Sequence, residues 1–582
     1  MDNNSELRLY GRSVSRGIAS GKAVCLYGKR RQFFRVSLGK EELDRETRRF
    51  RAAIRLSNRQ LEKLAAGQNG SVPASMASVL DFHRSVLHDP ALIEAIEQQI
   101  NDEGVNAEWA VKQVTDSYLL RYKNISDQRM RERYRDLEDV TDRILGALSG
   151  STERFELEPA TVIVAHELNP STLIELSSRQ PVAIVTEQGG WTSHTYILAR
   201  ELAIPAVTGI KGLYQLIRSG DRVVVDGFTG EVVARPTDRT TVDHAPNERF
   251  VERLRNTGTG SFRTLDGREI KIFANADLPG RYESAKRGGA RGIGLFRSEF
   301  CFRRSHDLPG EEEQYRAYRR MAELTGAYGI RIRTFDISAD ELVDHQFTHG
   351  KNPALGLRGV RLSLETPVVF RTQLRAVLRA SSGTSIDVIL PMVSDVEEIR
   401  ATRAIMIEER ERLEVAGVAM GYPRLGAMIE VPSAVLTIDD ILTEADILCL
   451  GTNDLVQYIL AVDRDNESVS QYFNSLHPAV IKAIGTVLRA AEKHRKPCIV
   501  CGEMAGSPFY VPLLIGLGAK ALSMNPATIP HVLEVVQGIA YEETLSLVRE
   551  VESSDTAAKN DATVKRFADE TWQHLTDTTP TP

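Results

Sequence analysis

The sequence predicts a multidomain α/β protein in which a small α/β domain, interrupted by a helical bundle, is followed by a (β/α)8 TIM-type barrel. Three observations predict this architecture. The chain has 582 residues, which is enough for several domains. A charged, glycine-poor stretch with helical periodicity separates two stretches of strand-like sequence. The C-terminal half then alternates short apolar runs with helical stretches.

Strand-like sequence with glycine turns lies on both sides of the helical stretch. It occupies residues 8–28, and it returns from about 158 to 235 in runs such as "ATVIVAHEL" and "DRVVVDG". Two such halves form one domain when the entry and exit points of the insertion lie close together. We therefore predict a single α/β domain built from residues 1–36 and 150–235.

The sequence between these halves has the period of amphipathic helices. Phe50 and Ile54 fall on one helical face, and "LEDVTDRILGAL" repeats the pattern. We predict an inserted helical domain over residues 37–149. His83 and His88 lie on this insertion, and we expect both to be exposed helix residues.

The C-terminal half contains eight strand-like runs after a linker with one charged helix, predicted at residues 236–260. The runs are "EIKIFAN", "GIGLF", "IRIRTF", "IDVILPMV", "RLGAMIEV", "DILCLGT", "PCIVCGE" and "AKALSMN". Eight β-then-α units in roughly 280 residues fit a (β/α)8 barrel, which we predict over residues 261–545. The remainder, 546–582, is predicted to be a polar tail, frayed apart from "FADETWQHL".

Composition argues against several classes of protein. The formal net charge of −6 argues against a nucleic-acid-binding protein. The polar N-terminus lacks the apolar core of a signal peptide, and apolar windows such as "YVPLLIGLG" are shorter than the ~20 residues that span a bilayer. Five scattered cysteines favour a reducing compartment without disulfides. We expect a cytoplasmic protein without membrane insertion.

Chemically useful side chains follow the apolar runs, where a barrel of this type places its active site. They are Asn275, Arg297, Glu299, Arg333, Asp336, Glu430, Asn453, Asp454, Cys501 and Glu503. Arginines bind phosphate or carboxylate oxygens bidentately, and carboxylates such as Glu430 and Asp454 suit Mg²⁺. The set predicts a mouth for a small, highly anionic substrate. The alternative is that these charges are solvated loop residues.

His194 follows a glycine turn at the start of a predicted helix. "PVAIVTEQGG" indicates a strand ending in a turn, and "SHTYILARELA" indicates the helix, with Thr192 or Ser193 as N-cap. Unpaired N–H groups and the helix dipole favour an anion there. His194 is therefore a candidate phosphoryl carrier, and the alternative is a turn that happens to contain a histidine.

The motifs "GGWTSHTYILAR", "GIGLFRSEF", "RTFD", "GTNDLVQYILAVDR" and "CGEMAG" resemble, in this order, those of the phosphoenolpyruvate–protein phosphotransferase family, enzyme I of the bacterial sugar phosphotransferase system. The similarity runs from about residue 10 to 540. It implies a swivelling phosphohistidine domain followed by a phosphoenolpyruvate-binding barrel. The inserted helices and the length of the chain point to enzyme I among the phosphoenolpyruvate-using enzymes.

The resemblance implies a role for each matching residue. His194 matches the histidine that is phosphorylated on Nε2, and Cys501 matches the acid that protonates the enolate to give pyruvate. Glu430 and Asp454 match the Mg²⁺ ligands. The residues that match substrate contacts are Arg297, Arg333, Arg358, Asn453, Asp454 and Arg464.

The resemblance also implies partners. The phosphoryl group passes to a histidine of a small phosphocarrier protein such as HPr, with the helical insertion as docking surface. The α/β domain would swing about the 236–260 linker, and the barrel would form a homodimer. Two alternatives stay open: a nitrogen-regulatory version of the enzyme, and a catalytically impaired regulatory homologue. A pyruvate phosphate dikinase would need an ATP-grasp domain, for which there is no room before residue 150.

The chain departs from the family pattern at several positions. After "RTFD" the family usually has Ile-Gly-Gly-Asp-Lys, but here "ISADEL" replaces both glycines by Ser338 and Ala339 and lacks the lysine. Ser507 stands for a usual Asp, Tyr196 for a small residue and Cys449 for a Ser. We predict an active enzyme with slow turnover.

Two other motifs carry no separate function. "GIASGKA" is one residue too short for a P-loop, and it has Ala23 where Ser or Thr would contact Mg²⁺. "CIVC" is predicted to be a strand, with Cys498 and Cys501 on opposite sides of it.

Overall fold

The structure of the protein is a computed structural model. It falls into two compact units, Met1–Ala245 and Pro246–Pro582, and each is described by itself. The residues that the structure describes are 5–26, 34–66, 74–123, 128–150, 158, 160–177, 179, 181–189, 194–202, 204–237, 240, 262–301, 309–339, 352–464, 466 and 469–577.

One mixed sheet forms the centre of the first unit. Its strands, in spatial order, are β1 (Leu7–Tyr10), β8 (Glu231–Ala234), β7 (Arg222–Asp226), β3 (Ile18–Leu26), β4 (Thr161–Ala165), β5 (Ala183–Thr186), β6 (Ala206–Thr208) and β2 (Arg12–Ser15). Strands β3 to β6 are parallel to one another. Every residue of β4 and β5 is buried, as expected for strands covered on both faces.

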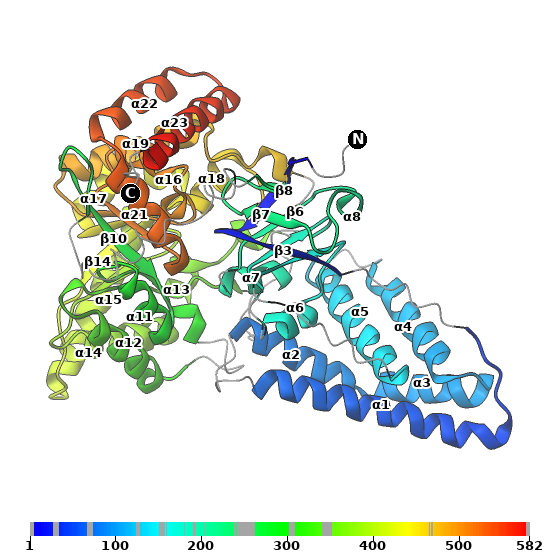
Figure 1. The fold of residues 1–582 in the computed structure, drawn as a ribbon. Helices are drawn as coiled ribbons and strands as arrows, with labels where there is room; N and C mark the ends of the chain where they lie inside the picture. Colours follow the sequence, from blue (N-terminus) through cyan, green and yellow to red (C-terminus); the bar gives the residue numbers. More distant parts are fainter. Residues whose placement is uncertain are drawn as a thin grey trace. The chain divides into compact units, whose positions relative to one another are not determined.

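Five helices interrupt this sheet between the adjacent strands β3 and β4. They are α1 (Lys40–Ala66), α2 (Ala74–Leu87), α3 (Pro90–Glu103), α4 (Ala107–Lys123) and α5 (Gln128–Leu148), drawn blue to cyan in Figure 1. Phe50, Ile96 and Ile144 are fully buried among them. Because β3 and β4 pair directly, the interruption leaves and re-enters the sheet at neighbouring strands. The predicted fold class is confirmed for this part of the chain.

The expectation for the two histidines of the insertion is half wrong. His88 is exposed, but the His83 side chain is fully buried, and its Nε2 lies 4.0 Å from Oδ1 of Asp136 and 4.0 Å from Oδ2 of Asp139. His83 continues the buried stripe of Leu80 on α2, three residues away on the same helical face. Asp139 also accepts hydrogen bonds from Ser171 N (3.0 Å) and Oγ (2.6 Å), so α2 and α5 meet the α/β domain there.

Among the described residues of the first unit, the helices outside the insertion are α6 (Pro170–Ser177), α7 (His194–Glu201) and α8 (Leu213–Leu216). Helix α7 is held to the rest of the domain by the Thr195 hydroxyl, which donates to the Leu168 carbonyl oxygen at 2.6 Å. Residues 190–193, which precede this helix, lie outside the described residues.

Eight parallel strands close into a barrel in the second unit. They are β10 (Glu269–Asn275), β11 (Ile293–Arg297), β12 (Ile330–Arg333), β13 (Ile386–Leu390), β14 (Arg424–Ile429), β15 (Ile447–Gly451), β16 (Cys498–Cys501) and β17 (Ala521–Met524). Each pairs with the next, and β17 pairs with β10 to complete the ring. All eight predicted runs are confirmed. The short β9 (Phe262–Arg263) adds an antiparallel pairing to β10.

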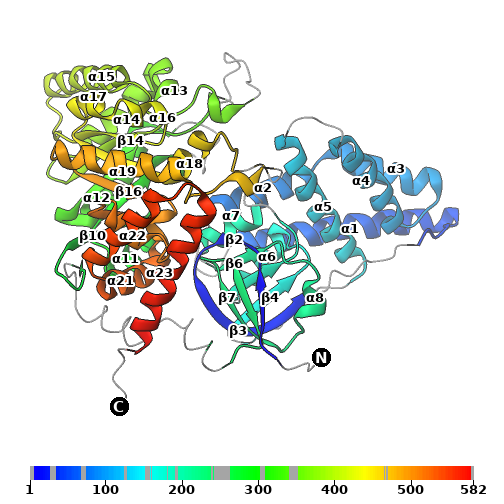
Figure 2. The same cartoon turned by 90° about the horizontal axis from the view of Figure 1, so that it is seen from above.

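Helices surround these strands, as Figures 1 and 2 show from two directions. They are α11 (Pro279–Arg287), α12 (Glu311–Thr325), α13 (Gly359–Glu365), α14 (Pro367–Ala380), α15 (Val396–Val415), α16 (Pro432–Leu436), α17 (Ile438–Glu444), α18 (Thr452–Leu460), α19 (Pro478–Lys493), α20 (Val511–Gly516), α21 (Ile529–Gly538), α22 (Tyr541–Ser553) and α23 (Ala557–Asp577). An apolar core lies between strands and helices, and a smaller cluster fills the barrel interior. Among the described residues, no helix is both long and apolar enough to cross a membrane.

The expectation of a frayed C-terminal tail is wrong. Helix α23 packs on α21 and α22, with Val564 and Ala568 buried. The Asn560 amide is also buried and donates from Nδ2 to the Leu476 carbonyl oxygen at 2.9 Å. The inward face of this helix combines Val564, Phe567 and Ala568 with the buried polar residues Asn560 and Thr563, so its apolar period is weak in a sequence that is otherwise polar.

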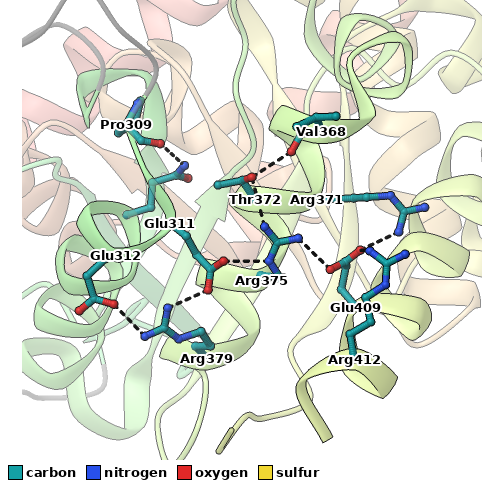
Figure 3. A network of polar contacts seen from close by, with 11 residues as sticks. Pro309, Glu311, Glu312, Val368, Arg371, Thr372, Arg375, Arg379, Glu409 and Arg412 are labelled. Carbon is teal, nitrogen blue, oxygen red and sulfur yellow. Dashed lines mark hydrogen bonds and ion pairs between the residues drawn. The ribbon is translucent and has the colours of Figure 1, made fainter. Parts of the chain in front are cut away.

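A network of ion pairs joins α12, α14 and α15 (Figure 3). The Glu409 side chain on α15 is fully buried, and its carboxylate accepts from Arg371 (2.6 Å), Arg375 (3.0 Å) and Arg412 (2.8 Å). Arg375 also reaches Glu311 at 2.8 Å. Buried charge is tolerated here because it is paired and hydrogen-bonded.

Candidate active site

The parallel barrel brings the ends of its strands to one mouth, and most of the predicted residues lie there. Ion pairs join several of these side chains, and their charges shift one another's pKa values. Side chains at the ends of β11, β12, β14 and β15 therefore lie close together. The alternative of unrelated solvated loop charges does not fit these contacts.

Arg297 ends β11 and is held by Asp277, which follows β10. The two carboxylate oxygens of Asp277 accept separately, Oδ1 from the Arg297 backbone N–H (3.0 Å) and Oδ2 from its Nη2 (2.6 Å). Asp277 is buried, whereas the Arg297 side chain is 38% exposed. Asp277 therefore holds the Nη2 end of the guanidinium group in place, and part of the Arg297 side chain remains accessible to a ligand. Sequence analysis missed Asp277, although it stands only two residues beyond a predicted strand.

Arg333 ends β12 between two carboxylates. Its Nη2 donates to Oε1 of Glu299, and its Nη1 lies 3.1 Å from Oδ2 of Asp336. Burial alone would lower the pKa of Arg333, but these carboxylates raise it well above its ordinary value. Burial, helped by Asp336, raises the pKa of Glu299. Oε2 of Glu299 is buried without a hydrogen-bond partner among the described residues.

Arg358 is attached to the same carboxylate from the other side. Its Nε and Nη2 lie 3.2 and 3.0 Å from Oδ1 of Asp336. Burial alone would raise the pKa of Asp336, but Arg333 and Arg358 together lower it below its ordinary value. Arg358 also pairs through its backbone with Ser338, one of the residues that departs from the family pattern. Residues 340–351, which include the rest of "ISADEL", lie outside the described residues.

Glu430 ends β14 and is almost completely buried. Its Oε1 accepts from the Met392 backbone N–H at 2.7 Å, and Met392 has a positive φ of 58°. Burial, and then the charges of Asp454 and Asp336, raise the pKa of Glu430 to about 8. Carboxylates that repel one another in a buried site fit a divalent cation, because its charge would remove the repulsion. Glu430 and Asp454 are therefore suitable Mg²⁺ ligands.

The space beside Glu430 depends on a glycine. A Cβ atom at Gly451 would lie 2.7 Å from Oε2 of Glu430 and 3.1 Å from its Cβ. Asp454 stands in the first turn of α18, directly beyond this glycine. Among the described residues, no three His, Cys, Asp or Glu side chains are arranged to hold a metal ion by themselves.

Asn453 and Arg464 complete the α18 side of the mouth. Nη1 of Arg464 lies 3.4 Å from Oδ1 of Asp454. Oδ1 of Asn453 accepts from the Glu503 backbone N–H at 3.1 Å, which ties α18 to the end of β16. Gly502, which directly follows β16, has φ 94°, and a Cβ atom there would lie 2.5 Å from Oγ1 of Thr452.

Cys501 is the last residue of β16 and lies in the barrel interior, 1% exposed. Its thiol donates to the Ile499 carbonyl oxygen at 3.7 Å. Cys498 lies instead against the core between strands and helices, so the two cysteines face opposite sides of the strand as predicted. The prediction that "CIVC" is a strand is confirmed.

His194 is the first residue of α7, as predicted, but its side chain lies outside the described residues. The candidate caps Thr192 and Ser193, and residues 238, 239 and 241–260 of the predicted linker, are also outside them. The structure does describe the residues that pack around the first turn of α7. Tyr196 is buried, and its hydroxyl contacts the Thr186 hydroxyl. A Cβ atom at Gly189 (φ 134°) would lie 2.5 Å from the Tyr196 ring, so this large residue fits because residue 189 is glycine.

The mouth can therefore bind a strongly anionic small molecule. Three arginines converge on it with carboxylates that set their positions, and two further carboxylates suit a divalent cation. A thiol lies just inside. These are the parts that phosphoryl transfer requires, namely charge neutralisation and positioning.

Comparison with known proteins matches the whole chain to one class of enzyme. Three family models of PEP-utilising enzymes match it: the N-terminal domain over residues 10–133, the mobile domain over 157–230 and the PEP-binding domain over 251–541. A phosphoenolpyruvate-protein phosphotransferase of Cupriavidus necator is 36% identical over 583 residues, covering 96% of this chain and 99% of the relative. A protein of the same name from Enterococcus faecalis is 35% identical over 574 residues, covering 96% and 99%.

Proposed function

The chain belongs to the phosphoenolpyruvate–protein phosphotransferase family, and from this premise we propose that it transfers a phosphoryl group from phosphoenolpyruvate to His194 and then to a histidine of an HPr-like phosphocarrier protein. As a member of the family the protein is a transferase. Pyruvate is the second product. The single observation that carries the proposal is the convergence of Arg297, Arg333 and Arg358 with Glu430 and Asp454 at one barrel mouth.

Phosphoenolpyruvate carries a phosphate and a carboxylate, and the mouth offers a cation for each. Arg297 and Arg333 would bind the phosphoryl oxygens. Asp277 holds the guanidinium group of Arg297 in position before substrate binds. Glu299 and Asp336 do the same for Arg333. Arg358, Arg464 and Asn453 would make further contacts with the substrate. Fixed donors lose little orientational freedom on binding, so they favour the transition state.

Mg²⁺ would be held by Glu430 and Asp454 together with substrate oxygens and water, and when bound it would neutralise charge on the phosphoryl group. The protein itself contributes the rigid position of Glu430, through the Met392 N–H and the glycine at 451.

His194 would attack phosphorus as a neutral imidazole. Its place at the start of α7 supports this role, because free backbone N–H groups at a helix start favour the phosphate it would carry. The enolate that leaves must gain a proton on carbon. Cys501, buried at the end of β16 just inside the mouth, would supply it.

The same histidine must serve both the barrel and the carrier. We therefore propose that the α/β domain moves about the 236–260 linker between the two partners. The helical insertion of residues 37–149 would dock the carrier, and the barrel would mediate a homodimer. We also propose that the protein acts as the general component of the sugar phosphotransferase system.

The proposal is tested by incubating the protein with labelled phosphoenolpyruvate and Mg²⁺. We expect pyruvate release and acid-labile label on the wild type, with onward transfer when an HPr-like carrier is added. His194→Ala should take no label, whereas the matched control His88→Ala, an exposed histidine of the same unit, should be labelled like the wild type. Absence of label on the wild type would refute the proposal.

A catalytically impaired regulatory homologue is the second candidate, favoured by the changes at Ser338 and Ala339. Ala339 nevertheless donates its N–H to the Leu357 carbonyl oxygen at 2.9 Å, so this segment still supports Arg358. Pyruvate release separates the two candidates. Labelling of a nitrogen-regulatory carrier in preference to HPr would favour the regulatory version of the enzyme.

A further inference from the structure

A second thiol lies beside Cys501 in the barrel interior. Cys449 is on β15, which pairs in parallel with β16; Cys449 is opposite Ile499, and Gly451 is opposite Cys501. Cys449 is two residues before Gly451, the residue that pairs with Cys501. Because side chains two residues apart on a strand face the same side of the sheet, Cys449 and Cys501 face the same side. Both cysteines belong to the interior cluster and are 0% and 1% exposed.

The surroundings of this thiol pair are mainly apolar, and the nearest charges are those of the ion-paired Arg331 and Asp387. The other members of the cluster are Phe273, Leu295, Ile389, Met428, Ile447, Ile499 and Ala521. An ionised sulfur in such a place is costly unless a donor stabilises it. Contact with the Cys501 thiol, followed by burial, raises the pKa of Cys449 well above its ordinary value. Cys449 therefore keeps its proton and remains a donor when Cys501 loses its own.

Cys501 needs such a donor at one step of the reaction. This reasoning rests on the function proposed above, in which Cys501 protonates the enolate. A C–H bond forms at the methylene carbon of the enolate, the S–H bond of Cys501 breaks, and the electron pair stays on Sγ as a thiolate. The Ile499 carbonyl, which accepts from the Cys501 thiol at 3.7 Å, is an acceptor and cannot stabilise that charge.

We propose that Cys449 is a positioning residue that acts through Cys501, donating its S–H to the Cys501 thiolate as the enolate takes up its proton. Cys498 cannot take this part, because it lies on the outer side of β16. Arg331 is committed elsewhere, since its Nε donates to Oδ2 of Asp387 at 3.1 Å. Hydrogen bonds to charged groups are the stronger class, so the donor should matter mainly in the step that creates the charge.

The test compares two substitutions of nearly equal volume. Cys449→Ser retains a donor and Cys449→Ala removes it, so any packing loss is shared and the difference reports the hydrogen bond. The measurement is the single-turnover rate constant for pyruvate formation from phosphoenolpyruvate with Mg²⁺, over a range of substrate concentrations. We expect Cys449→Ser to stay within a few-fold of the wild type. Cys449→Ala should be slower by about tenfold at saturating substrate, with an unchanged half-saturating concentration.

The outcomes separate this inference from the proposed function. If the wild type releases no pyruvate, the proposed function fails and this inference fails with it. If the wild type is active but the Ser and Ala variants are equally fast or equally slow, Cys449 is a packing residue and only this inference fails. Cys449→Val, which removes the donor without opening a cavity, must behave like Cys449→Ala. Thermal melting of all variants verifies that each is folded.

Discussion

Gly451→Ala should damage the mouth by displacing one carboxylate while leaving the barrel folded. The added Cβ would lie 2.7 Å from Oε2 of Glu430 and 3.1 Å from its Cβ, both closer than ordinary carbon contacts. The backbone at Gly451 has φ −85°, so alanine meets no conformational penalty and the clash alone acts. Glu430 cannot retreat freely, because its Oε1 is held by the Met392 N–H at 2.7 Å.

The size of the effect follows from the overlap. Restoring ordinary contact, from 2.7 Å to at least 3.4 Å, requires a shift of about 0.7 Å, and displacements of about 1 Å in an active site cost roughly 100-fold in rate. We therefore expect kcat for pyruvate formation to fall about 10- to 100-fold, with a higher Mg²⁺ concentration needed for half-maximal rate. Overpacking of this kind costs about 1–3 kcal/mol of stability, which a folded barrel tolerates.

The assay is pyruvate release over a Mg²⁺ titration, with circular dichroism to verify the fold. Gly280→Ala is the matched control, because nothing lies within 4 Å of a Cβ atom there; it should leave both quantities unchanged. Wild-type kinetics in Gly451→Ala would show that the position of Glu430 does not matter for the reaction.

Three other predictions concern residues described above. Glu409→Gln should lower the free energy of unfolding by about 2–4 kcal/mol, because three arginines lose their shared buried carboxylate; Glu408→Gln, at a half-exposed neighbour, should cost less than about 1 kcal/mol in the same denaturation experiment. Asp277→Asn should raise KM for phosphoenolpyruvate several-fold with little change in melting temperature, since it removes the charged partner of Arg297 Nη2, while the amide oxygen can still accept from the Arg297 backbone N–H; an unchanged KM would mean that this support is dispensable. Val564→Asp should detach α23 and lower the melting temperature, because a fully buried apolar position would receive a charge; a wild-type melting curve would contradict the packing described here.

The strands of the barrel were predictable because each is a short apolar run bounded by polar sequence. From them, the rule that polar residues at strand ends meet at one mouth selected Arg297, Arg333, Glu430 and Asp454, which the structure places close together. The same rule could have found Asp277, had it been applied two residues further along the loop.

Other features depend on contacts that a linear pattern does not record. His83 was expected to be exposed because histidine is polar, yet it completes an apolar stripe and meets buried carboxylates from a distant helix. Only the "FADETWQHL" part of helix α23 was expected to be ordered, because the inward face before it includes the polar residues Asn560 and Thr563. The support of Arg358 by Asp336 joins residues 22 positions apart, which only the tertiary structure reveals.

Closure of the barrel also sets the order in which the protein can become active during synthesis. The sheet of the first unit has all its strands once residue 234 leaves the ribosome. The mouth, in contrast, contains side chains from positions between Asp277 and Cys501. The ring of strands closes only when β17, Ala521–Met524, pairs with β10. If His194 carries the phosphoryl group as proposed, a chain truncated before residue 521 should keep the complete first-unit sheet but lack a closed barrel, so that only a second, full-length copy could phosphorylate it.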